Sequence, residues 1–322
     1  MKILVAPLNW GLGHATRCIP IIHHYLSQGH EVVLAGDGDS LKLLRGRFST
    51  LRVIDLPPLD LRYSANAQQR GFYIRAAWRL MRSTIADHYY LRQLLAIEHF
   101  DLIISDNRFG LFSRDTHCVY ITHQLYPILP MRLRWLLSFA RALHACIYKR
   151  YDEVWVPDHV DVSHNLSGAL SHGGNFDKHA KYIGPLSRFT LFSSANPSKV
   201  DRGMYSYGVV AILSGLEPQR SMFEKYLLKR FEKTNDSLLL VQGKIGQPRT
   251  KVSRGNITIM SNICDEELVV AVQQASVIIA RSGYSTIMDL DALGVLHKAE
   301  LHPTPGQSEQ EYLAKTYHQL HI

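Results

Sequence analysis

Short apolar runs alternate with helix-length segments over most of this 322-residue chain. In the first half, such runs lie at residues 2–8, 30–36, 51–56, 101–105, 117–122 and 153–157. In the second half they lie at 207–213, 237–243, 256–260, 275–281 and 295–301, with helical segments at 220–232, 265–274 and 285–293. The runs are short and rich in Val, Ile and Leu, as in strands that helices cover on both faces. The pattern predicts an α/β protein with two Rossmann-like domains, each with a doubly wound parallel sheet.

A polar stretch separates the two sets of runs. Residues 184–203 are rich in Ser, Asn, Pro and Lys and have no apolar period to bury, so we predict a linker there. The N-terminal domain then covers residues 1–183 and the C-terminal domain residues 204–322. The last segment predicts a helix that stops at Ile322 without a capping residue, as in a naturally short or a truncated chain.

Composition and cysteine placement are typical of a cytosolic globular protein. Apolar residues make up 46% and charged residues 20% of the chain, and no signal-peptide pattern opens it. The longest apolar stretch, residues 135–148, contains Arg141 and His144 and is shorter than the ~20 residues of a spanning helix. The scattered cysteines favour reduced thiols: Cys18, Cys118, Cys146 and Cys264. We therefore expect a cytoplasmic protein with no spanning segment.

The net charge of +8 is concentrated in one part of the chain. Residues 62–150 hold thirteen Lys and Arg against five Asp and Glu, which accounts for the whole surplus. Such a surface suits nucleic acid, anionic lipid or a phosphorylated substrate, and charge alone does not separate the three. Within it, residues 131–150 mix Leu, Trp and Phe with basic side chains, as in an interfacial helix: Arg132, Arg134, Arg141, Lys149 and Arg150. The basic character extends to Arg75, Arg79 and Arg82. The alternative for residues 131–150 is an ordinary core-packing helix whose basic face is exposed to solvent.

A glycine turn follows the first predicted strand. Gly11-Leu12-Gly13-His14 places backbone N–H groups and a positive helix end at one point, which suits an anion or a polar substrate. As a dinucleotide fingerprint it is incomplete, because Thr16 replaces the third glycine, although Asp37 follows the second strand. His14 at the first helical turn is a candidate general base, or else a histidine bonded to a nearby carbonyl.

No metal site is predicted. Asp37-Gly-Asp39 resembles a metal-binding DxD motif but lies in a turn-rich setting after a strand, and we interpret it as a turn. Other His, Cys and carboxylate spacings give no convincing ligand set.

The second half carries its own glycine turn. In residues 280–294 a strand ends, the chain turns at Ser282-Gly283, and a helix opens with Ser285 and Thr286 in its first turn. This arrangement can hold a diphosphate. Asp289 lies one helical turn beyond Ser285 on the same face, where its carboxylate can accept hydrogen bonds from ribose hydroxyls. The alternative is that Asp289 is an acidic side chain exposed to solvent on the helix.

These motifs resemble the MurG-like family of GT-B glycosyltransferases. NWGLGHATR is similar to the first glycine loop of that family, ITHQLYP to its His-Glu-Gln-Asn segment, and YIGPLSR to its Gly-Asn-Pro-x-Arg linker. Ser214-Gly215 corresponds to its second glycine loop, ARSGYSTIMD to its donor loop, and PGQSEQEYLA to its sugar-binding segment. Six segments in the same order are more specific than any one of them.

The resemblance implies a transferase that takes a hexose or N-acetylhexosamine from a UDP-sugar held in a cleft, without a metal or another cofactor. It implies donor-side roles for Arg188, Ser214, Gly215, Ile263, Arg281, Ser282, Gly283, Ser285, Thr286, Asp289, Gln310 and Glu311, and acceptor-side roles for Gly11, Gly13, His123 and Gln124. Asp289 would hold the ribose, and the backbone of Ile263 would hold the uracil. The diphosphate would be held by Arg188, by Ser214 and by the turn of residues 282–286. Gln310 and Glu311 would hold the sugar hydroxyls.

The departures from the family leave the substrates open. Trp10 and Leu12 stand where the family has smaller residues, so the resemblance does not determine the acceptor. A lipid-linked acceptor, in cell-envelope or glycoconjugate synthesis, would suit a basic helix that contacts the inner face of a membrane. Gln310-Glu311 replaces a Gln-Gln pair, so the sugar is not fixed either.

An inverting reaction needs one base. We expect His14 to be that base. Asp106, at the end of the predicted strand 101–105, is the second candidate. The alternative for Asp106 is that it only forms a turn. His123, at the next strand end, is a candidate for acceptor binding or for a structural role. A UDP-sugar 2-epimerase of the same fold is the alternative reaction, and a basic nucleic-acid-binding protein is disfavoured because no such motif accompanies the charge.

Overall fold

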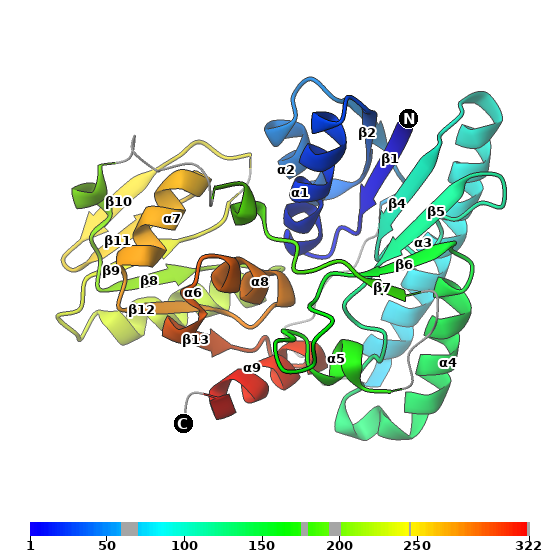
Figure 1. Ribbon diagram of the computed structural model, residues 1–322. Coiled ribbons are helices and arrows are strands. Elements are labelled where there is room, and N and C mark those ends of the chain that lie inside the picture. The colour runs from blue at the N-terminus through cyan, green and yellow to red at the C-terminus, as the bar shows by residue number, and fades with distance from the viewer. Residues whose placement is uncertain (59–69, 175–179, 193–200, 245, 321–322) are drawn as a thin grey trace. The chain divides into compact units, whose positions relative to one another are not determined.

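The computed structural model divides the chain into two compact α/β units (Figure 1). It describes all residues except 59–69, 175–179, 193–200, 245 and 321–322. Among the described residues, the first unit runs to Leu186 and includes Gly306–Glu309, and the second comprises Ser187–Pro305 and the residues from Gln310 onward.

The first unit is built on a seven-stranded parallel sheet of order β3-β2-β1-β4-β5-β6-β7. Its strands are β1 (Lys2–Pro7), β2 (Glu31–Gly36), β3 (Arg52–Asp55), β4 (Leu102–Asp106), β5 (His117–Ile121), β6 (Glu153–Val156) and β7 (Ala180–Tyr182). Alternate residues of these strands enter different clusters: Ile3 and Val5 on one face, Leu4 and Ala6 on the other. Burial on both faces explains why the strands appear as continuous apolar runs in the sequence.

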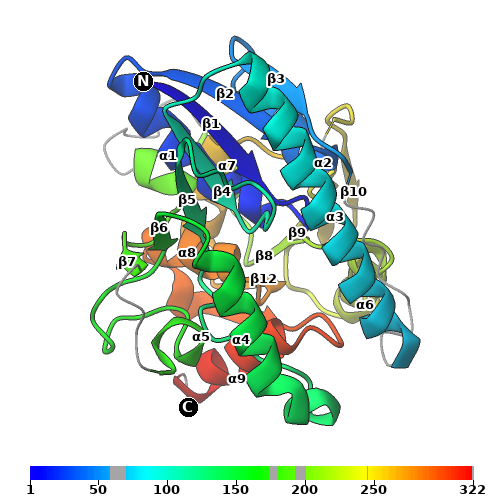
Figure 2. The ribbon, with the colours of Figure 1, turned by 90° about the vertical axis from the view of Figure 1, so that its right-hand side faces the viewer.

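Helices cover both faces of this sheet. Helices α1 (Gly13–Ser27) and α2 (Gly38–Arg47) pack on the face with Ile3, whereas α3 (Arg70–Ile97) packs on the face with Leu4. Figure 2 shows α3 and α4 (Leu137–Tyr148) on the same side of the sheet, with Tyr148 of α4 against the cluster that α3 covers. A 3₁₀ helix (Met131–Leu136) precedes α4, and the short α5 spans Ala169–His172.

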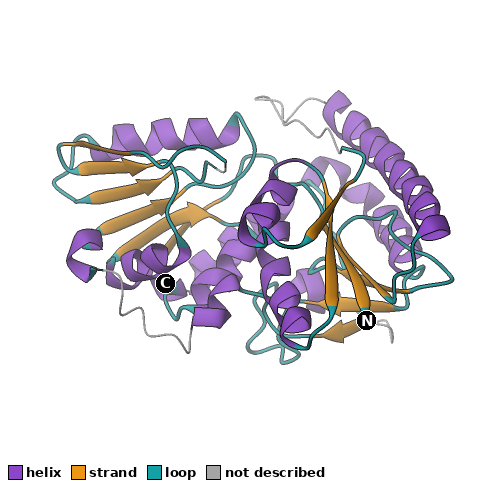
Figure 3. Ribbon diagram, turned by 90° about the horizontal axis from the view of Figure 1, so that it is seen from above, coloured by secondary structure: helices purple, strands orange, loops and turns teal. Residues whose placement is uncertain are grey.

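The second unit has a six-stranded sheet of order β10-β11-β9-β8-β12-β13, parallel except for β10. Its strands are β8 (Val209–Ile212), β9 (Leu238–Val241), β10 (Lys251–Arg254), β11 (Ile257–Met260), β12 (Val277–Arg281) and β13 (Ala299–His302). Helix α6 (Gln219–Phe231) packs on one face, and α7 (Asp265–Gln274) with α8 (Tyr284–Ala292) on the other. Helix α9 (Ser308–Leu320) follows β13. Figure 3 shows that helices lie on both sides of the strands in each unit.

Two doubly wound α/β units were predicted, and the sheets confirm them. Two strands escaped prediction, because β7 has only three residues and every residue of β10 is exposed. The predicted strand at 295–301 begins at Ala299, after a 3₁₀ turn.

The segment predicted as a linker contains residues that pack. The chain passes from the first unit to the second between Leu186 and Ser187, and a 3₁₀ helix spans Arg188–Phe192. Phe189 is buried in the core beneath α7, so this part belongs to the second unit rather than to a loose connection.

A buried arginine after β4 joins three other elements of the first unit. Arg108 donates hydrogen bonds to Asp87 on α3 at 2.7 and 3.0 Å, to Asp37 after β2 at 2.6 Å, and to the carbonyl of Pro57 at 3.0 Å. Asn9 also bonds to Asp37, at 3.1 Å. Asp37 is thus held inside the fold, which fits neither a metal-binding motif nor a free ribose ligand.

Candidate active site

The best-defined group of polar side chains lies where the strand order of the first sheet reverses. Strands β1 and β4 are neighbours with Pro7 opposite Asp106, and α1 begins just after β1. Such a reversal leaves a crevice at the carboxyl ends of the strands, where ligands of α/β proteins usually bind. His14, in the first turn of α1, lies here with its Nδ1 2.8 Å from Oδ1 of Asp106. The two candidates for the base are therefore direct partners.

Asp106 is enclosed by hydrogen-bond donors. Its side chain has no exposed surface, and Nε of Arg17 donates to its Oδ2 at 2.5 Å while Nη2 of Arg17 contacts its Oδ1. Burial alone would raise the pKa of Asp106, but the charges and hydrogen bonds of Arg17 and His14 lower that pKa to about 2. A carboxylate held in this way stays ionised and orients His14, so Asp106 is poorly suited to taking a proton itself.

His14 keeps one ring nitrogen available. Its side chain is 14% exposed, and no described residue hydrogen-bonds to its Nε2. Burial and the charge of Arg17 lower the pKa of His14, while Asp106 opposes that shift. An imidazole that is uncharged near neutral pH can accept a proton, as a general base must.

Arg17 is a site residue that the sequence analysis missed. It lies three positions after His14 on α1, hence on the same helix face, and only 1% of it is exposed. Arg17 could have been recognised because it stands among the buried apolar positions of a helix. A charge at such a position requires a partner in the interior.

The acceptor-side candidates of the next strand bond to a more distant segment. Nε2 of His123 lies 2.8 Å from Oε1 of Glu309, and the side-chain amide of Gln124 donates to the other oxygen of Glu309. His123 is 4% exposed and its Nδ1 lies 3.1 Å from Nη1 of Arg17. Both ring nitrogens of His123 thus have partners in the structure, which favours the structural role that was its alternative. A direct contact of His123 with an acceptor stays a prediction.

The two acceptor-side glycines flank the turn before His14. Gly11 has φ of 78°, the left-handed region that favours glycine, and a Cβ there would meet nothing within 4 Å. Gly13 is the first residue of α1.

In the second unit, the turn before α8 has the predicted form. Gly283 is the N-cap of α8, and Ser285 and Thr286 follow in the first turn with half-buried side chains. Ser282 is buried, and its hydroxyl donates to the carbonyl of Gln310 at 2.8 Å, which fixes the turn against the start of α9. The N–H groups at this helix start can receive an anion.

Two predicted donor ligands, Arg188 and Asp289, are paired with each other. Nε of Arg188 lies 3.6 Å from Oδ2 of Asp289, and its Nη1 lies 3.3 Å from Oδ1 of Asp265. Ser187 donates to Asp289 Oδ1 at 2.6 Å. Burial raises the pKa of Asp289 to about 6, despite the opposing charge of Arg188. A nucleotide bound here would exchange these contacts for its own hydroxyl and phosphate groups.

Arg281 is buried and bonds to two backbone carbonyls. It is 6% exposed, its Nη1 donates to the carbonyl of Pro303 at 2.7 Å and its Nη2 to that of Gln219 at 3.2 Å, and its guanidinium lies 4.0 Å from the ring centre of Phe223. Burial lowers the pKa of Arg281 to about 10. Arg281 therefore joins the segments after β8 and β13, and its contact with a diphosphate stays a prediction.

The remaining donor-side candidates lie at or near strand ends of the same unit. Ser214 and Gly215 follow β8, with Gly215 at φ of 96°, and Ile263 precedes α7 and packs against the core. Gln310 accepts a hydrogen bond from the backbone of Thr304 at 2.8 Å, and Glu311 is exposed.

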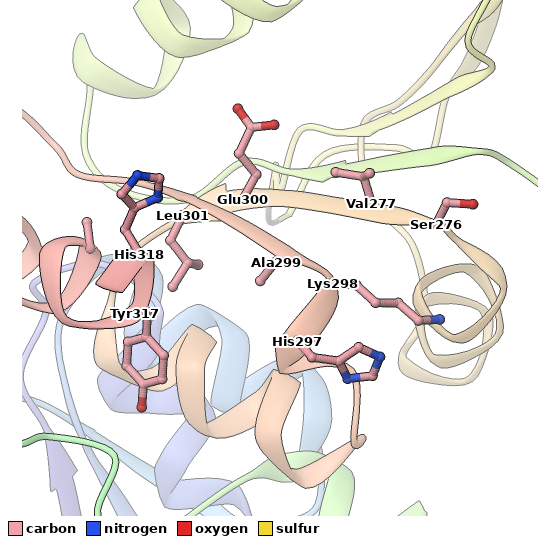
Figure 4. A pocket seen from close by; sticks show the side chains of 10 residues that line it. Ser276, Val277, His297, Lys298, Ala299, Glu300, Leu301, Tyr317 and His318 are labelled. Atoms are coloured by element: carbon pink, nitrogen blue, oxygen red, sulfur yellow. The ribbon is translucent and has the colours of Figure 1, made fainter. Parts of the chain in front are cut away.

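A pocket of about 350 Å³ in the second unit lies apart from these residues. It follows β13 at the edge of the sheet, between the turn before that strand and α9 (Figure 4). None of the candidate site residues lines it.

The chain is similar in sequence to two proteins described as glycosyltransferases. No family model matches the chain. An uncharacterized glycosyltransferase of Methanosarcina acetivorans is 22% identical over 97% of this chain and 82% of its own length. Its counterpart in Methanosarcina mazei is 20% identical over the same shares.

Solved structures of glycosyltransferases share the fold. The calicheamicin glycosyltransferase CalG4 is similar over 97% of this chain and 83% of its own, with 13% identity and a TM-score of 0.60. UGT2 of Phytolacca americana is similar over 99% and 83%, with 13% identity and a TM-score of 0.60. The chain therefore has the GT-B fold of two Rossmann-like domains, and the comparisons support glycosyltransferase as its class.

Proposed function

We propose that the protein is a MurG-like, metal-independent inverting glycosyltransferase that moves a hexose or N-acetylhexosamine from a UDP-sugar to an acceptor hydroxyl. The observation that carries this proposal is His14 at the strand reversal, whose Nδ1 lies 2.8 Å from Oδ1 of Asp106 while none of the described residues bonds to its Nε2. A histidine oriented by a buried carboxylate is the arrangement that general-base catalysis requires.

The chemistry assigns one step to each group. The acceptor oxygen attacks the anomeric carbon as the bond from that carbon to the nucleotide diphosphate breaks, and the hydroxyl proton passes to Nε2 of His14. Asp106 stabilises the imidazolium that forms. The N–H groups at the start of α8, with Ser285 and Thr286, receive the charge that develops on the departing diphosphate.

The donor assignments follow the same proposal. Asp289 holds the ribose, while Arg188, Ser214 and Gly215 contact the diphosphate and the Ile263 backbone holds the uracil. Gln310 and Glu311 bind the sugar. Support comes from structures of the same fold: UGT2 of Phytolacca americana was solved with UDP-2-fluoro-glucose and pterostilbene, and the spinosyn rhamnosyltransferase SpnG with thymidine diphosphate.

A lipid-linked acceptor and a place at the inner face of an anionic membrane complete the proposal. No described helix is long and apolar enough to cross a bilayer. The segment of residues 131–150 nevertheless exposes large apolar side chains beside basic ones, with Trp135 79% and Phe139 68% exposed. Arg134, Lys149 and Arg150 are exposed too, which supports peripheral contact.

The experiment follows the fate of the donor. The protein is incubated with radiolabelled UDP-glucose or UDP-N-acetylglucosamine and an extract of cell lipids. We expect label to leave the nucleotide for an acceptor. In His14→Gln we expect the rate to fall about 10²–10⁴-fold while UDP affinity, measured by calorimetry, is unchanged.

Two results would contradict the proposal. Label that remains wholly on an epimerised nucleotide sugar would identify an isomerase instead. Normal turnover by folded His14→Gln would remove His14 as the base. Exposed His24→Gln at the other end of α1 is the matched control and should behave as wild type.

A further inference from the structure

Arg17 is a buried cation that the proposed reaction leaves without a step. Its guanidinium contacts both oxygens of Asp106, and it also lies within hydrogen-bond distance of His14 and His123. One arginine thus connects the expected base, the carboxylate that orients it and a second histidine.

The donor geometry of arginine determines where the proton of His123 sits. A guanidinium has only N–H donors, so Nδ1 of His123, 3.1 Å from Nη1 of Arg17, must accept. The ring proton is then on Nε2, which donates to Oε1 of Glu309 at 2.8 Å.

At His14 the same reasoning leaves the opposite tautomer. Nδ1 of His14 lies 2.8 Å from Oδ1 of Asp106 and 2.8 Å from Nη2 of Arg17, and one nitrogen cannot donate to the first and accept from the second. Arg17 already donates to Asp106, and a bond from Nδ1–H to an ionised carboxylate is charge-assisted. The proton therefore sits on Nδ1, and Nε2 carries the lone pair.

We propose that Arg17 is a positioning residue that shares Asp106 with His14, holds His14 as a base at Nε2 and weakens its affinity for the proton. The catalytic meaning of this inference rests on the proposed function, in which His14 is the base. When Nε2 takes the proton, the imidazolium lies beside the Arg17 guanidinium, and the single charge of Asp106 serves two cations. His14 consequently stays deprotonated to lower pH than it would beside an unshared carboxylate.

The groups that face His14 act on its pKa in opposite directions: Arg17 and His123 lower that pKa, whereas Asp106 raises it. They are Arg17 and Cys18 on α1, Asp106 on β4, His123 after β5 and Glu309 at the start of α9. Burial raises the pKa of the Cys18 thiol well above its usual value, so that group stays uncharged. Removing Arg17 would leave Asp106, with the ionised Glu309, to stabilise the imidazolium, and the pKa of His14 would rise.

The test is nuclear magnetic resonance of histidine-¹⁵N-labelled full-length protein, with signals assigned by His14→Gln and His123→Gln. In the wild type we expect the ring proton on Nδ1 of His14 and on Nε2 of His123. In Arg17→Met we expect the His14 titration midpoint to rise by about one pH unit or more. Arg17→Lys keeps the positive charge, so it should raise the His14 titration midpoint less than Arg17→Met does. Arg45→Met, which removes an exposed arginine paired with Asp55, is the control and should leave the midpoint unchanged.

Two outcomes overturn the proposal: an unchanged His14 midpoint in folded Arg17→Met, or a wild-type His14 with its proton on Nε2. The second needs no variant, so it decides the matter even if Arg17→Met does not fold. Where turnover is measurable, the acid limb of kcat/KM in Arg17→Met should move to higher pH with donor KM unchanged. Expected tautomers without any sugar transfer would instead refute the proposed function alone.

Discussion

Gly283 is a glycine that neither the backbone nor its neighbours require. Its φ is −73°, which any residue adopts, and a Cβ there would lie 3.9 Å from Gln310 Nε2 and Thr286 Oγ1, an ordinary contact. Gly215 differs, because its φ of 96° strains any other residue. Because the fold itself does not require glycine at residue 283, Gly283 suits a position where a ligand approaches the backbone closely.

We therefore predict that Gly283→Ala weakens UDP binding about tenfold or more while the free energy of unfolding changes by less than about 1 kcal/mol. Calorimetric titration and denaturant unfolding measure the two quantities. Gly46→Ala is the matched control, because Gly46 lies in α2 with open space around it and its replacement should leave UDP affinity unchanged. Unaltered UDP affinity in Gly283→Ala would argue against a diphosphate at this turn.

Residue chemistry was partly predictable from the sequence. His14 was recognisable because a histidine in the first helical turn after a glycine turn faces the strand ends. The partners of Arg17 and Arg281 were not, because each guanidinium bonds to groups far away in the chain. Asp106 is 89 residues from Arg17, and Gln219 is 62 residues from Arg281.

Several elements of the first unit depend on Arg108, which bonds to α3 and to the segments after β2 and β3. Its removal would leave the carboxylates of Asp37 and Asp87 buried without their cation. We expect Arg108→Ala to lower the free energy of unfolding by about 3–5 kcal/mol. Denaturant unfolding measures this.

The control is Arg52→Ala, which breaks an ion pair with Glu98 at the surface and should cost about 0–1 kcal/mol. Equal losses in the two variants would contradict the role of Arg108.

The elements most open to prediction are the ones buried on both sides. Strands such as β1, with five of its six residues buried and apolar, stand out in the sequence. The exposed β10 lacks that signal, because none of its residues is buried, although it pairs with β11. Phe189 also escaped notice, since the apolar residues of the stretch 184–203 follow neither a helical nor a strand period.

The surface of the first unit carries exposed apolar side chains on two helices of one side. Trp78, Met81, Ile85 and Tyr89 lie on α3, and Trp135, Phe139 and Leu143 lie on α4 and the turn before it. With the basic surplus of residues 62–150, this surface suits an anionic bilayer.

We predict that the protein sediments with phosphatidylglycerol-containing vesicles at low salt and less with pure phosphatidylcholine vesicles. Trp135→Ser combined with Phe139→Ser should reduce the bound fraction at least about threefold, because two large apolar anchors are lost. Met222→Ser with Tyr226→Ser on α6 is the control, since both residues are exposed on the other unit. Binding that is independent of lipid charge, or equal in the two double variants, would contradict the prediction.

The sequence by itself determined the two α/β units, the order of most strands and helices, and the glycine turns, because burial on both faces of a sheet imposes a local apolar pattern. The tertiary structure decided which polar side chains meet. Three features depend on segments that only folding brings together: the division of Asp106 between His14 and Arg17, the pairing of Arg188 with Asp289, and the burial of Arg281. A charged side chain must find a partner wherever it is buried, and the sequence shows the need but not the partner.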